Sequence, residues 1–238
     1  MSARVATKPR PLGEMAYESL RRDIIGCVLP PGAQVTEGRV CEMYQMGKAP
    51  VRAALMRLSQ EGLVRAVPRH GYLVAPITLK SVQDLFELRL VVEPGIARLA
   101  IGRIDVAALR KVNVAPGASR GDEAELTFLK ANRDFHLAIA EATGNRRLYA
   151  MMAQLLDDMA RLLHLGLFSP DWRDGSMRSA HESQAAQHEE LIAALAKGDA
   201  AAAEGAARVH IEESRELVMK ALHSQDAVTI GRVHWPAR

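Results

Sequence analysis

Three histidines and one asparagine have the residue types and the spacing of a metal site. Asn132 and His136 are four residues apart, so on a helix both side chains project from one face. His188 lies ten residues before Gly198 and His210 twelve residues after it. In a helical hairpin that turns at this glycine, the two histidines would differ in height by only about 3 Å. Three imidazoles and a carbonyl oxygen inside a bundle would suit Zn²⁺, Ni²⁺ or a similar divalent ion.

His181 precedes His188 by seven residues, falls on nearly the same side of a helix and can reach the same cavity. Taken singly, each of these histidines is more often a hydrogen-bonded core or surface residue than a metal ligand, and the spacing only partly changes that balance. A metal hydrolase is an alternative interpretation. However, His181-Glu182 lacks a second histidine four residues on, and the chain has no G-x-S-x-G, Walker or dinucleotide-binding glycine motif. The pattern favours a binding site over an enzyme.

Long amphipathic helices must position these side chains. Ser81 opens one of them, with Val82, Leu85, Leu88 and Val92 on one side. From there to about residue 224 no alternating strand pattern occurs. The helices are separated by Gly102, a loop at 116–121, Gly144, a loop at 169–176, and Gly198. We therefore predict six or seven helices in an all-α antiparallel bundle over residues 78–224, whose inward faces can carry a ligand site.

A second set of candidate residues lies between Met46 and Val74. Pro50 suits a first helical turn, so a helix is predicted to start there after a loop that carries Lys48. The apolar face of this helix recurs at spacings of three and four, whereas its basic side chains stay free to point into solvent. The apolar positions are Val51, Ala54, Leu55 and Leu58, and the basic ones are Lys48, Arg52 and Arg57. The helix is therefore predicted to be basic on its open side.

Two short strands are expected after this helix. Gly62 ends the helix, and residues 63–67 and 69–74 read as strands with a turn at Gly71. Two further helices are expected before the one that starts at Pro50. The first covers residues 15–27, and the second is a short helix through Met43 that Thr36 can cap. The predicted domains are a disordered arm at 1–11, a DNA-binding domain at 12–77, the bundle at 78–224 and a tail at 225–238.

Composition agrees with this division. The 238 residues are 48% hydrophobic, enough to fill two cores, and carry a net charge of +3. Through Thr78 there are 11 Lys and Arg against 6 Asp and Glu, so the excess positive charge lies at the end that is expected to bind a polyanion. Cys27 and Cys41 are too few for a disulfide framework, which favours a reducing compartment. No apolar run is long enough to cross a membrane, so we expect a cytoplasmic protein.

Three separated motifs resemble the winged helix-turn-helix of the GntR family of bacterial transcription regulators. They are P-G-A-Q-V-T-E at 31–37, A-P-V-R-A-A-L-M-R-L-S-Q-E-G-L-V at 49–64, and R-H-G-Y-L-V at 69–74. The resemblance implies contacts to a DNA operator, with Lys48 and Arg52 at the start of the recognition helix and His70 at the wing tip. The full predicted set is Arg39, Lys48, Ala49, Arg52, Arg57, Arg69, His70 and Gly71. Relatives usually have Ser-Arg-Thr where this chain has Gly47-Lys48-Ala49, and often an arginine where it has Gly38.

Three further stretches resemble the FCD-type effector domain of the FadR branch of that family. They are E-L-R-L-V-V-E-P-G-I-A-R-L-A at 87–100, N-R-D-F-H-L-A-I-A-E-A-T-G-N at 132–145, and H-E-E-L-I-A-A-L-A-K-G-D-A-A-A-A at 188–203. In metal-binding members, one carboxylate and three histidines hold the ion. The resemblance maps these histidines onto His136, His188 and His210, and it places Asn132 at the carboxylate position. Asparagine is the weaker ligand because it is neutral.

The resemblance also implies an effector, commonly a small carboxylate bound beside the metal. Arg89 matches an arginine that often faces this pocket, and a guanidinium binds a carboxylate through two parallel hydrogen bonds. The alternative for Arg89 is an ion pair with Glu93 one turn on, which would contribute little at a surface. His181 is the second candidate for effector binding.

The combined hypothesis is a mainly α protein that acts as a ligand-responsive, homodimeric transcription regulator and not as an enzyme. As a repressor it would bind a palindromic double-stranded DNA operator and sense a small carboxylate at a pocket that holds a divalent metal. The alternative is a hydrolase-like metal bundle fused to a DNA-binding module. An architectural DNA binder without ligand control would not need some 150 residues of bundle with inward polar groups.

Overall fold

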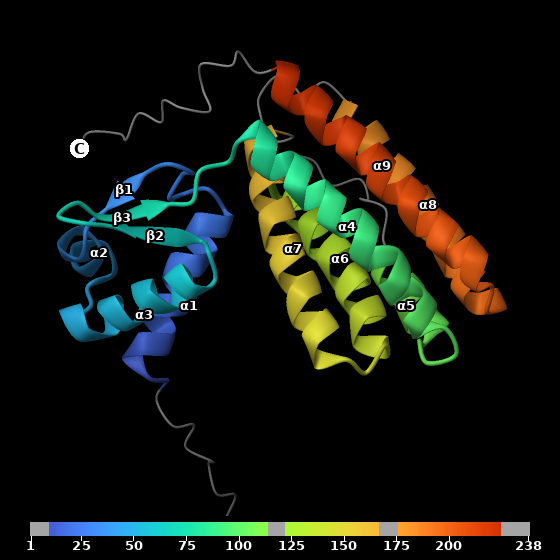
Figure 1. Ribbon diagram of the computed structural model, residues 1–238, viewed down its shortest axis with the longest axis horizontal. Helices are drawn as coiled ribbons and strands as arrows, with labels where there is room; N and C mark the ends of the chain where they lie inside the picture. The colour runs from blue at the N-terminus through green and yellow to red at the C-terminus, as the bar shows by residue number, and fades with distance from the viewer. Residues whose placement is uncertain (1–9, 114–121, 167–175, 225–238) are drawn as a thin grey trace, which may run out of the picture. The chain divides into compact units, whose positions relative to one another are not determined.

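The computed structural model describes residues 10–113, 122–166 and 176–224 (Figure 1). The chain divides into two compact units, one up to Ile77 and the other from Thr78. The described residues are mainly helical, which confirms the predicted fold class. Most of the predicted arm, residues 1–9, and the whole of the predicted tail, residues 225–238, lie outside the described residues.

The first unit combines three helices with a small antiparallel sheet. Its elements are α1 (Leu12–Ile25), β1 (Gln34–Val35), α2 (Glu37–Tyr44), α3 (Lys48–Gln60), β2 (Val64–Val67) and β3 (Gly71–Val74). The central strand β3 pairs with both others, in the order β1-β3-β2, with Val64 opposite Val74 and Val67 opposite Gly71. This arrangement is a winged helix-turn-helix in which α3 precedes the wing.

The core of this unit lies between α1, α3 and the sheet. The predicted apolar face of α3 is buried throughout, together with the inward face of α1. These buried residues are Ala16, Leu20, Ile24, Val51, Ala54, Leu55 and Leu58. Packing of two amphipathic helices in this way fixes the side of α3 that remains open to solvent.

Three predicted helix starts were wrong: α1 begins at Leu12, three residues before Met15, and α3 and α4 each begin two residues early. Helix α3 begins at Lys48, not at Pro50, so Lys48 belongs to the first turn and not to a loop. Pro50 then stands at the third position, where a backbone N–H would still have no partner within the helix. Helix α4 (Leu79–Ala100) begins before Ser81 because Thr78 caps it. The Thr78 side chain accepts from the Ser81 N–H, and the Ser81 hydroxyl accepts from the Thr78 N–H.

The turn of the wing also differs from the prediction. It occupies residues 68–70, and His70 N–H donates to the Val67 carbonyl over 3.0 Å. Gly71 starts β3 instead of forming the turn, and it has a φ of 86°. A side chain there would approach the Val35 carbonyl oxygen to 2.5 Å, so the pairing of β3 with β1 requires glycine. Strand β1 was not predicted, since two residues are too few to show an alternating pattern.

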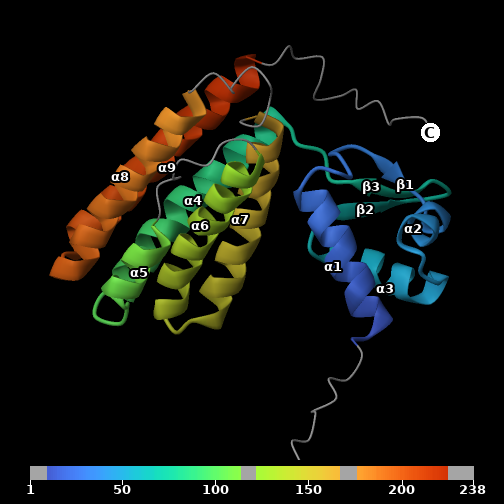
Figure 2. The ribbon, with the colours of Figure 1, turned by 180° about the vertical axis from the view of Figure 1, so that it is seen from behind.

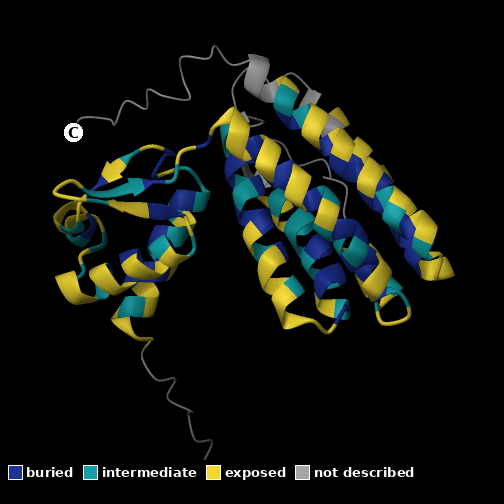
Figure 3. Ribbon diagram, viewed as in Figure 1, coloured by how far each residue is buried: buried dark blue, intermediate teal, exposed yellow. Residues whose placement is uncertain are grey.

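The second unit is an all-α bundle whose described helices number six. They are α4 (Leu79–Ala100), α5 (Val106–Val112), α6 (Asp122–Ala142), α7 (Arg146–Gly166), α8 (Ser176–Lys197) and α9 (Ala200–Ser224). Both views show α6 beside α7 and α8 beside α9 (Figures 1 and 2). The α8–α9 hairpin turns at Gly198, which has a φ of 69°, and α9 packs along α4. Buried residues therefore recur on the inward side of each helix (Figure 3).

Pro94 lies inside α4 and interrupts its backbone hydrogen bonding. Because proline has no N–H, the carbonyl of Leu90 four residues earlier loses its usual helical donor. Arg208 of α9 donates to this carbonyl instead, over 3.4 Å. The long helix thus receives a hydrogen bond from a neighbouring helix where its own is missing.

Candidate functional site

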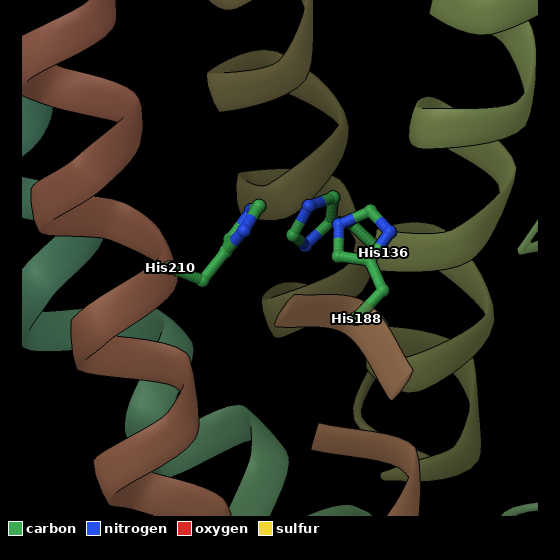
Figure 4. Close-up of side chains that lie close together, drawn as sticks. All are labelled: His136, His188 and His210. Atoms are coloured by element: carbon green, nitrogen blue, oxygen red, sulfur yellow. The ribbon is translucent and has the colours of Figure 1, made fainter. Parts of the chain in front are cut away.

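Three buried histidines from three helices meet inside the bundle. His136 comes from α6, His188 from α8 and His210 from α9, and one ring nitrogen of each lies within 4.8 Å of those of the other two. The ring centres are 4.7 Å apart for His188 and His210, and 5.2 Å from His136 to each of the others. Figure 4 shows the three rings turned toward one another.

Local packing holds the rings in this arrangement. The α8–α9 hairpin turns at Gly198, so His188 and His210 face each other as the spacing indicated. Phe135 of α6 stacks on the His188 ring, with centres 3.9 Å apart, and meets His136 edge-on. An aromatic ring locked in the core thus limits the rotation of two of the three imidazoles.

Each of the three imidazoles has a side-chain oxygen beside its Nδ1 atom. The distances are 3.4 Å from His136 to Glu93 Oε2, 3.2 Å from His188 to Asn113 Oδ1, and 2.9 Å from His210 to Gln187 Oε1. A neutral imidazole that donates from Nδ1 has its lone pair on Nε2. These oxygens therefore select the tautomer in which Nε2 can bind a metal, as outer partners of metal-bound histidines commonly do.

Buried acceptor atoms without partners support a cation site here. Nε2 of His136, Nε2 of His188 and Oδ1 of Asn132 are buried and, within the described residues, have no hydrogen-bond partner. Asn132 lies one turn before His136 on α6. Leaving such atoms unsatisfied is costly, and a divalent ion would satisfy them. Residues of this kind fit Zn²⁺ or Ni²⁺.

The cavity beside the histidines is small, with a volume of about 10 Å³. It is lined by Glu93, Ile96, Ala97, His136, Ile139, Met152, Leu191, Ala207 and His210. This volume accommodates about one water molecule or one ion. A larger ligand can enter only if side chains move.

Burial keeps the imidazoles neutral. It lowers the pKa of His188 to about 3, with the nearby Arg89 guanidinium acting in the same direction. The pKa of His136 is also held well below its ordinary value, first by burial and then by His210, His188 and Arg89. Burial likewise depresses the pKa of His210. Neutral imidazole is the form that binds metals, so protonation of these rings would not oppose metal binding at neutral pH.

Arg89 and Glu93 form a buried ion pair at the edge of this cavity. Arg89 Nε donates to Glu93 Oε1 over 2.5 Å, and the two side chains are 2% and 5% exposed. The sequence left open whether Arg89 faces the pocket or pairs with Glu93. It pairs with Glu93, but in the interior and not at the surface, and Glu93 itself lines the cavity beside His136.

His181 lies apart from the cluster of three. It is 5% exposed, and its ring stacks on Phe128 of α6 with centres 3.6 Å apart. Burial lowers its pKa to about 4. Neither the histidine cluster nor the lining of the small cavity includes it, so its predicted reach into that cavity is not seen.

Sequence reasoning missed Asn113 and Gln187. Asn113 follows α5 and is 75 residues from His188, a distance at which no local spacing could indicate contact. Gln187 directly precedes His188 on α8, yet it contacts His210 of the facing helix. Residues next to each other on a helix point in different directions. A search for side chains spaced three or four residues apart therefore does not detect a role for Gln187 beside His188.

The open face of α3 carries the principal candidates for DNA contact. Lys48 and Ala49 are exposed in the first turn, and Arg52 is exposed in the second. The Arg52 guanidinium donates two hydrogen bonds to Glu37 of α2, over 2.9 and 2.8 Å. Arg52 is exposed, as the spacing predicted, and it is also paired with Glu37. Glu37 holds the guanidinium in place at the surface.

Arg57 is exposed as well, as the spacing predicted, and its guanidinium is also paired. Its guanidinium contacts Glu14 at 3.1 Å, reaches Glu61 and covers the Tyr17 ring. It thus joins α3 to α1, whereas its contact with DNA stays a prediction. The other predicted contacts that are exposed are Arg39 in α2, and Arg69 and His70 at the wing turn. None of the described helices is long and apolar enough to cross a membrane.

Comparisons with known proteins agree with this architecture. Residues 12–74 match the model of bacterial regulatory proteins of the gntR family, and residues 84–213 match the FCD domain. The chain is 24% identical over 216 residues to the HTH-type transcriptional repressor RspR of Escherichia coli, covering 88% of this chain and 90% of RspR. It is 28% identical to the repressor GlaR of the same species, covering 87% of this chain and 95% of GlaR.

A solved structure supports the fold. E. coli McbR/YncC superposes with a TM-score of 0.73 at 21% identity, covering 89% of this chain and 99% of that one. The FCD match alone spans more than half of the sequence, and the two matches follow one another in the order of the two structural units. The chain therefore belongs to the GntR family of bacterial transcription regulators and carries an FCD domain behind its winged helix-turn-helix.

Proposed function

We propose that this regulator is a cytoplasmic repressor that binds a palindromic operator as a homodimer and is controlled by a small carboxylate at a metal-containing pocket. The cluster of His136, His188 and His210 carries the proposal, because their Nδ1 atoms face oxygens and two of their buried Nε2 atoms lack partners. Repression is supported by RspR and GlaR, which are named as repressors. Family membership weighs against the hydrolase alternative.

On the DNA side, α3 would enter the major groove. Lys48 and Arg52 lie at its N-terminal end, the part of a recognition helix that commonly contacts base edges. Glu37 orients Arg52 through two hydrogen bonds, which reduces the side-chain freedom lost on binding. His70 at the wing turn would contact the adjacent minor groove, and Arg39, Arg57 and Arg69 would contact phosphates.

On the ligand side, His136, His188 and His210 would hold the metal, with Asn132 as a fourth, neutral ligand. A divalent cation held by these residues would attract an anionic effector. Burial keeps the three imidazoles deprotonated, and Glu93, Asn113 and Gln187 fix their orientation. The carboxylate of Glu93 also balances part of the positive charge of the ion and of Arg89.

Effector binding would require the Arg89–Glu93 pair to open. The guanidinium is engaged by Glu93, and the cavity has room for about one water molecule. A carboxylate effector would therefore replace the Glu93 carboxylate on Arg89. Exchange of one anion for another would leave the buried guanidinium paired, and the displaced Glu93 carboxylate would stay beside His136 and the metal ion that His136 would hold. The bundle would repack around the effector and alter the DNA-binding state through differential affinity.

Two measurements test the proposal separately. Elemental analysis with native mass spectrometry of the purified protein, after supplementation with Zn²⁺ or Ni²⁺, should give one ion per chain. Absence of any ion would contradict the metal assignment and leave the DNA-binding assignment intact. A gel shift on operator DNA, with benzoate, lactate and succinate as probes, should show release by at least one carboxylate. Glu93→Gln should release DNA at a lower concentration of that probe, because Arg89 is then less tightly held.

A further inference from the structure

A second hollow lies in the bundle, in the groove between α8 and α9. It has a volume of about 420 Å³, which is within the range of small-molecule sites in proteins. Its described lining residues all come from these two helices, which run side by side (Figure 2). Within the described residues, it shares no lining residue with the small cavity beside the histidines. The α8–α9 hollow is therefore separate from the pocket assigned to the metal and the effector.

An unpaired amide oxygen belongs to the lining of this hollow. Gln184 is 9% exposed, and its Oε1 atom accepts no hydrogen bond from the part of the chain that the structure describes. Its Nε2 atom makes one long contact, 3.5 Å from Ser214 Oγ. A buried acceptor without a partner costs free energy. A hydrogen-bond donor brought by a ligand would satisfy it.

The charged side chains of the hollow also favour a donor. Glu213, Glu216 and Lys220 are exposed and line it, so two carboxylates stand against one ammonium group, a net formal charge of −1. Glu216 and Lys220 are one helical turn apart, and their opposite charges offset each other. Glu213 then remains as the unbalanced charge. A carboxylate together with the Gln184 oxygen suits a primary ammonium group, which has three donors and no acceptor.

Gln187 connects this hollow to the histidine cluster. Its Nε2 atom donates to Glu213 Oε2, and to Ser183 Oγ over 3.2 Å. Because an ionised carboxylate can only accept, the amide NH₂ group must face Glu213, and the amide oxygen then faces His210. This oxygen lies 2.9 Å from His210 Nδ1. Glu213 thus fixes the orientation of Gln187 and, through it, the tautomer of His210.

We propose that the α8–α9 hollow binds a small molecule that carries a primary ammonium group, which donates to Gln184 Oε1 and to the Glu213 carboxylate. The ammonium group competes with Gln187 for that carboxylate, so ligand binding loosens Gln187 and the His210 tautomer is no longer fixed. The site goes beyond the proposed function, and only its effect on the metal rests on it. Because such coupling is reciprocal, the ligand and the metal would each weaken the binding of the other.

The first test measures binding of putrescine, a small diamine, to the full chain after treatment with a chelator. Calorimetry should show saturable binding of putrescine and none of 1,4-butanediol, which has the same length without the charges. Glu213→Gln should weaken putrescine binding roughly tenfold or more, because a charge-assisted hydrogen bond is lost. Glu212→Gln is the matched control, since Glu212 is exposed, does not line the hollow, and its substitution changes the net charge equally.

The second test separates a ligand contact from a structural role of Gln184. Gln184→Met keeps the length of the side chain and removes the unpaired oxygen. The thermal unfolding midpoint should therefore not fall, whereas putrescine affinity should drop roughly tenfold. A lower midpoint with unchanged affinity would show that Gln184 serves packing only, and it would overturn the assignment of its oxygen to the ligand.

The third test follows the link to His210 by nitrogen NMR of the imidazoles, again without metal. Saturating putrescine should shift His210 away from the tautomer with hydrogen on Nδ1, and Glu213→Gln should do so without ligand. An unchanged His210 spectrum would overturn the link. The site itself would be overturned if putrescine did not bind, if butanediol bound equally well, or if Glu212→Gln weakened binding as much as Glu213→Gln. Failure of the chain to take up metal would contradict the proposed metal pocket and leave these three results standing.

Discussion

The two units place their polar groups in opposite ways. In the winged unit, Lys48, Arg52 and His70 are exposed at the surface, whereas His136 and Arg89 in the bundle are almost fully buried. Surface charges can act on a partner directly and depend mainly on one helix or turn. Buried groups act only through neighbours that satisfy and orient them. Substitutions in the first unit should therefore change one contact, whereas those in the second should change a whole network.

The largest effect is expected for His188→Ala. It removes one proposed ligand and one of the three facing imidazoles, so a metal ion should no longer co-purify. His70→Ala in the wing is the matched control and should retain one ion per chain while binding operator DNA less tightly. Elemental analysis and a gel shift on both variants would measure this separation. If His188→Ala retained a full complement of metal, the buried cluster would not be the metal site.

Arg52→Ala should show the reverse pattern. Loss of a bidentate base contact costs about 1–3 kcal/mol in each half-site, so a dimer should lose at least roughly 30-fold in operator affinity. Metal content should be unchanged, because Arg52 belongs to the first unit. Fluorescence anisotropy at fixed salt is a suitable measurement. Unchanged affinity for both Arg52→Ala and Lys48→Ala would show that α3 does not form the recognition surface.

Asn113→Ala would test how far the bundle site depends on its neighbours. Asn113 contacts the Nδ1 atom of His188, whereas the predicted metal-binding atom is Nε2. The substitution therefore keeps all the predicted ligands but removes the oxygen that selects the tautomer of His188. Metal affinity should fall about 10- to 100-fold, as measured by competition with a chelator. Asn113→Asp retains an acceptor oxygen for His188 but loses the Nδ2 donor to the Ala185 carbonyl, so it should recover only part of the affinity. Equal weakening by the two substitutions would argue for a packing role.

The smallest effect is a pH dependence of the metal-free protein. The pKa of His181 is about 4 in the folded state, against an ordinary value of about 6.5. Below pH 6.5 the unfolded chain takes up a proton that folded His181 does not, so stability falls as the pH drops toward 4. The loss attributable to this residue grows from nothing near pH 7 to its full size near pH 4. Above pH 7 this contribution is constant.

Urea unfolding between pH 7 and pH 4 would measure that loss. His181→Phe keeps an aromatic ring against Phe128 and cannot take up a proton, so its stability should fall less steeply over the same window. The three clustered histidines would still contribute their own slope. Parallel curves for the wild type and the variant would show that His181 has no such role.

The sequence predicted the positions of helices better than the contacts of polar side chains. Regular spacing identified the buried face of α3 and the facing pair His188 and His210, because both follow from helix geometry. Helix starts were missed where a cap decided them, as at Thr78. The partners of Arg52 and of the imidazoles were missed because they come from other helices. Such contacts depend on tertiary packing, which spacing along one helix does not contain.

Pro94 changes the stiffness of α4. A helix that lacks one backbone hydrogen bond bends most easily at that point, so α4 consists of two stiffer segments joined near Leu90. At this point Arg208 of α9, two residues before His210, donates a hydrogen bond to the Leu90 carbonyl of α4. A displacement of α9 that accompanies ligand binding at His210 would therefore lengthen or break this hydrogen bond. The angle between the two segments of α4 would then change when a ligand binds in the pocket.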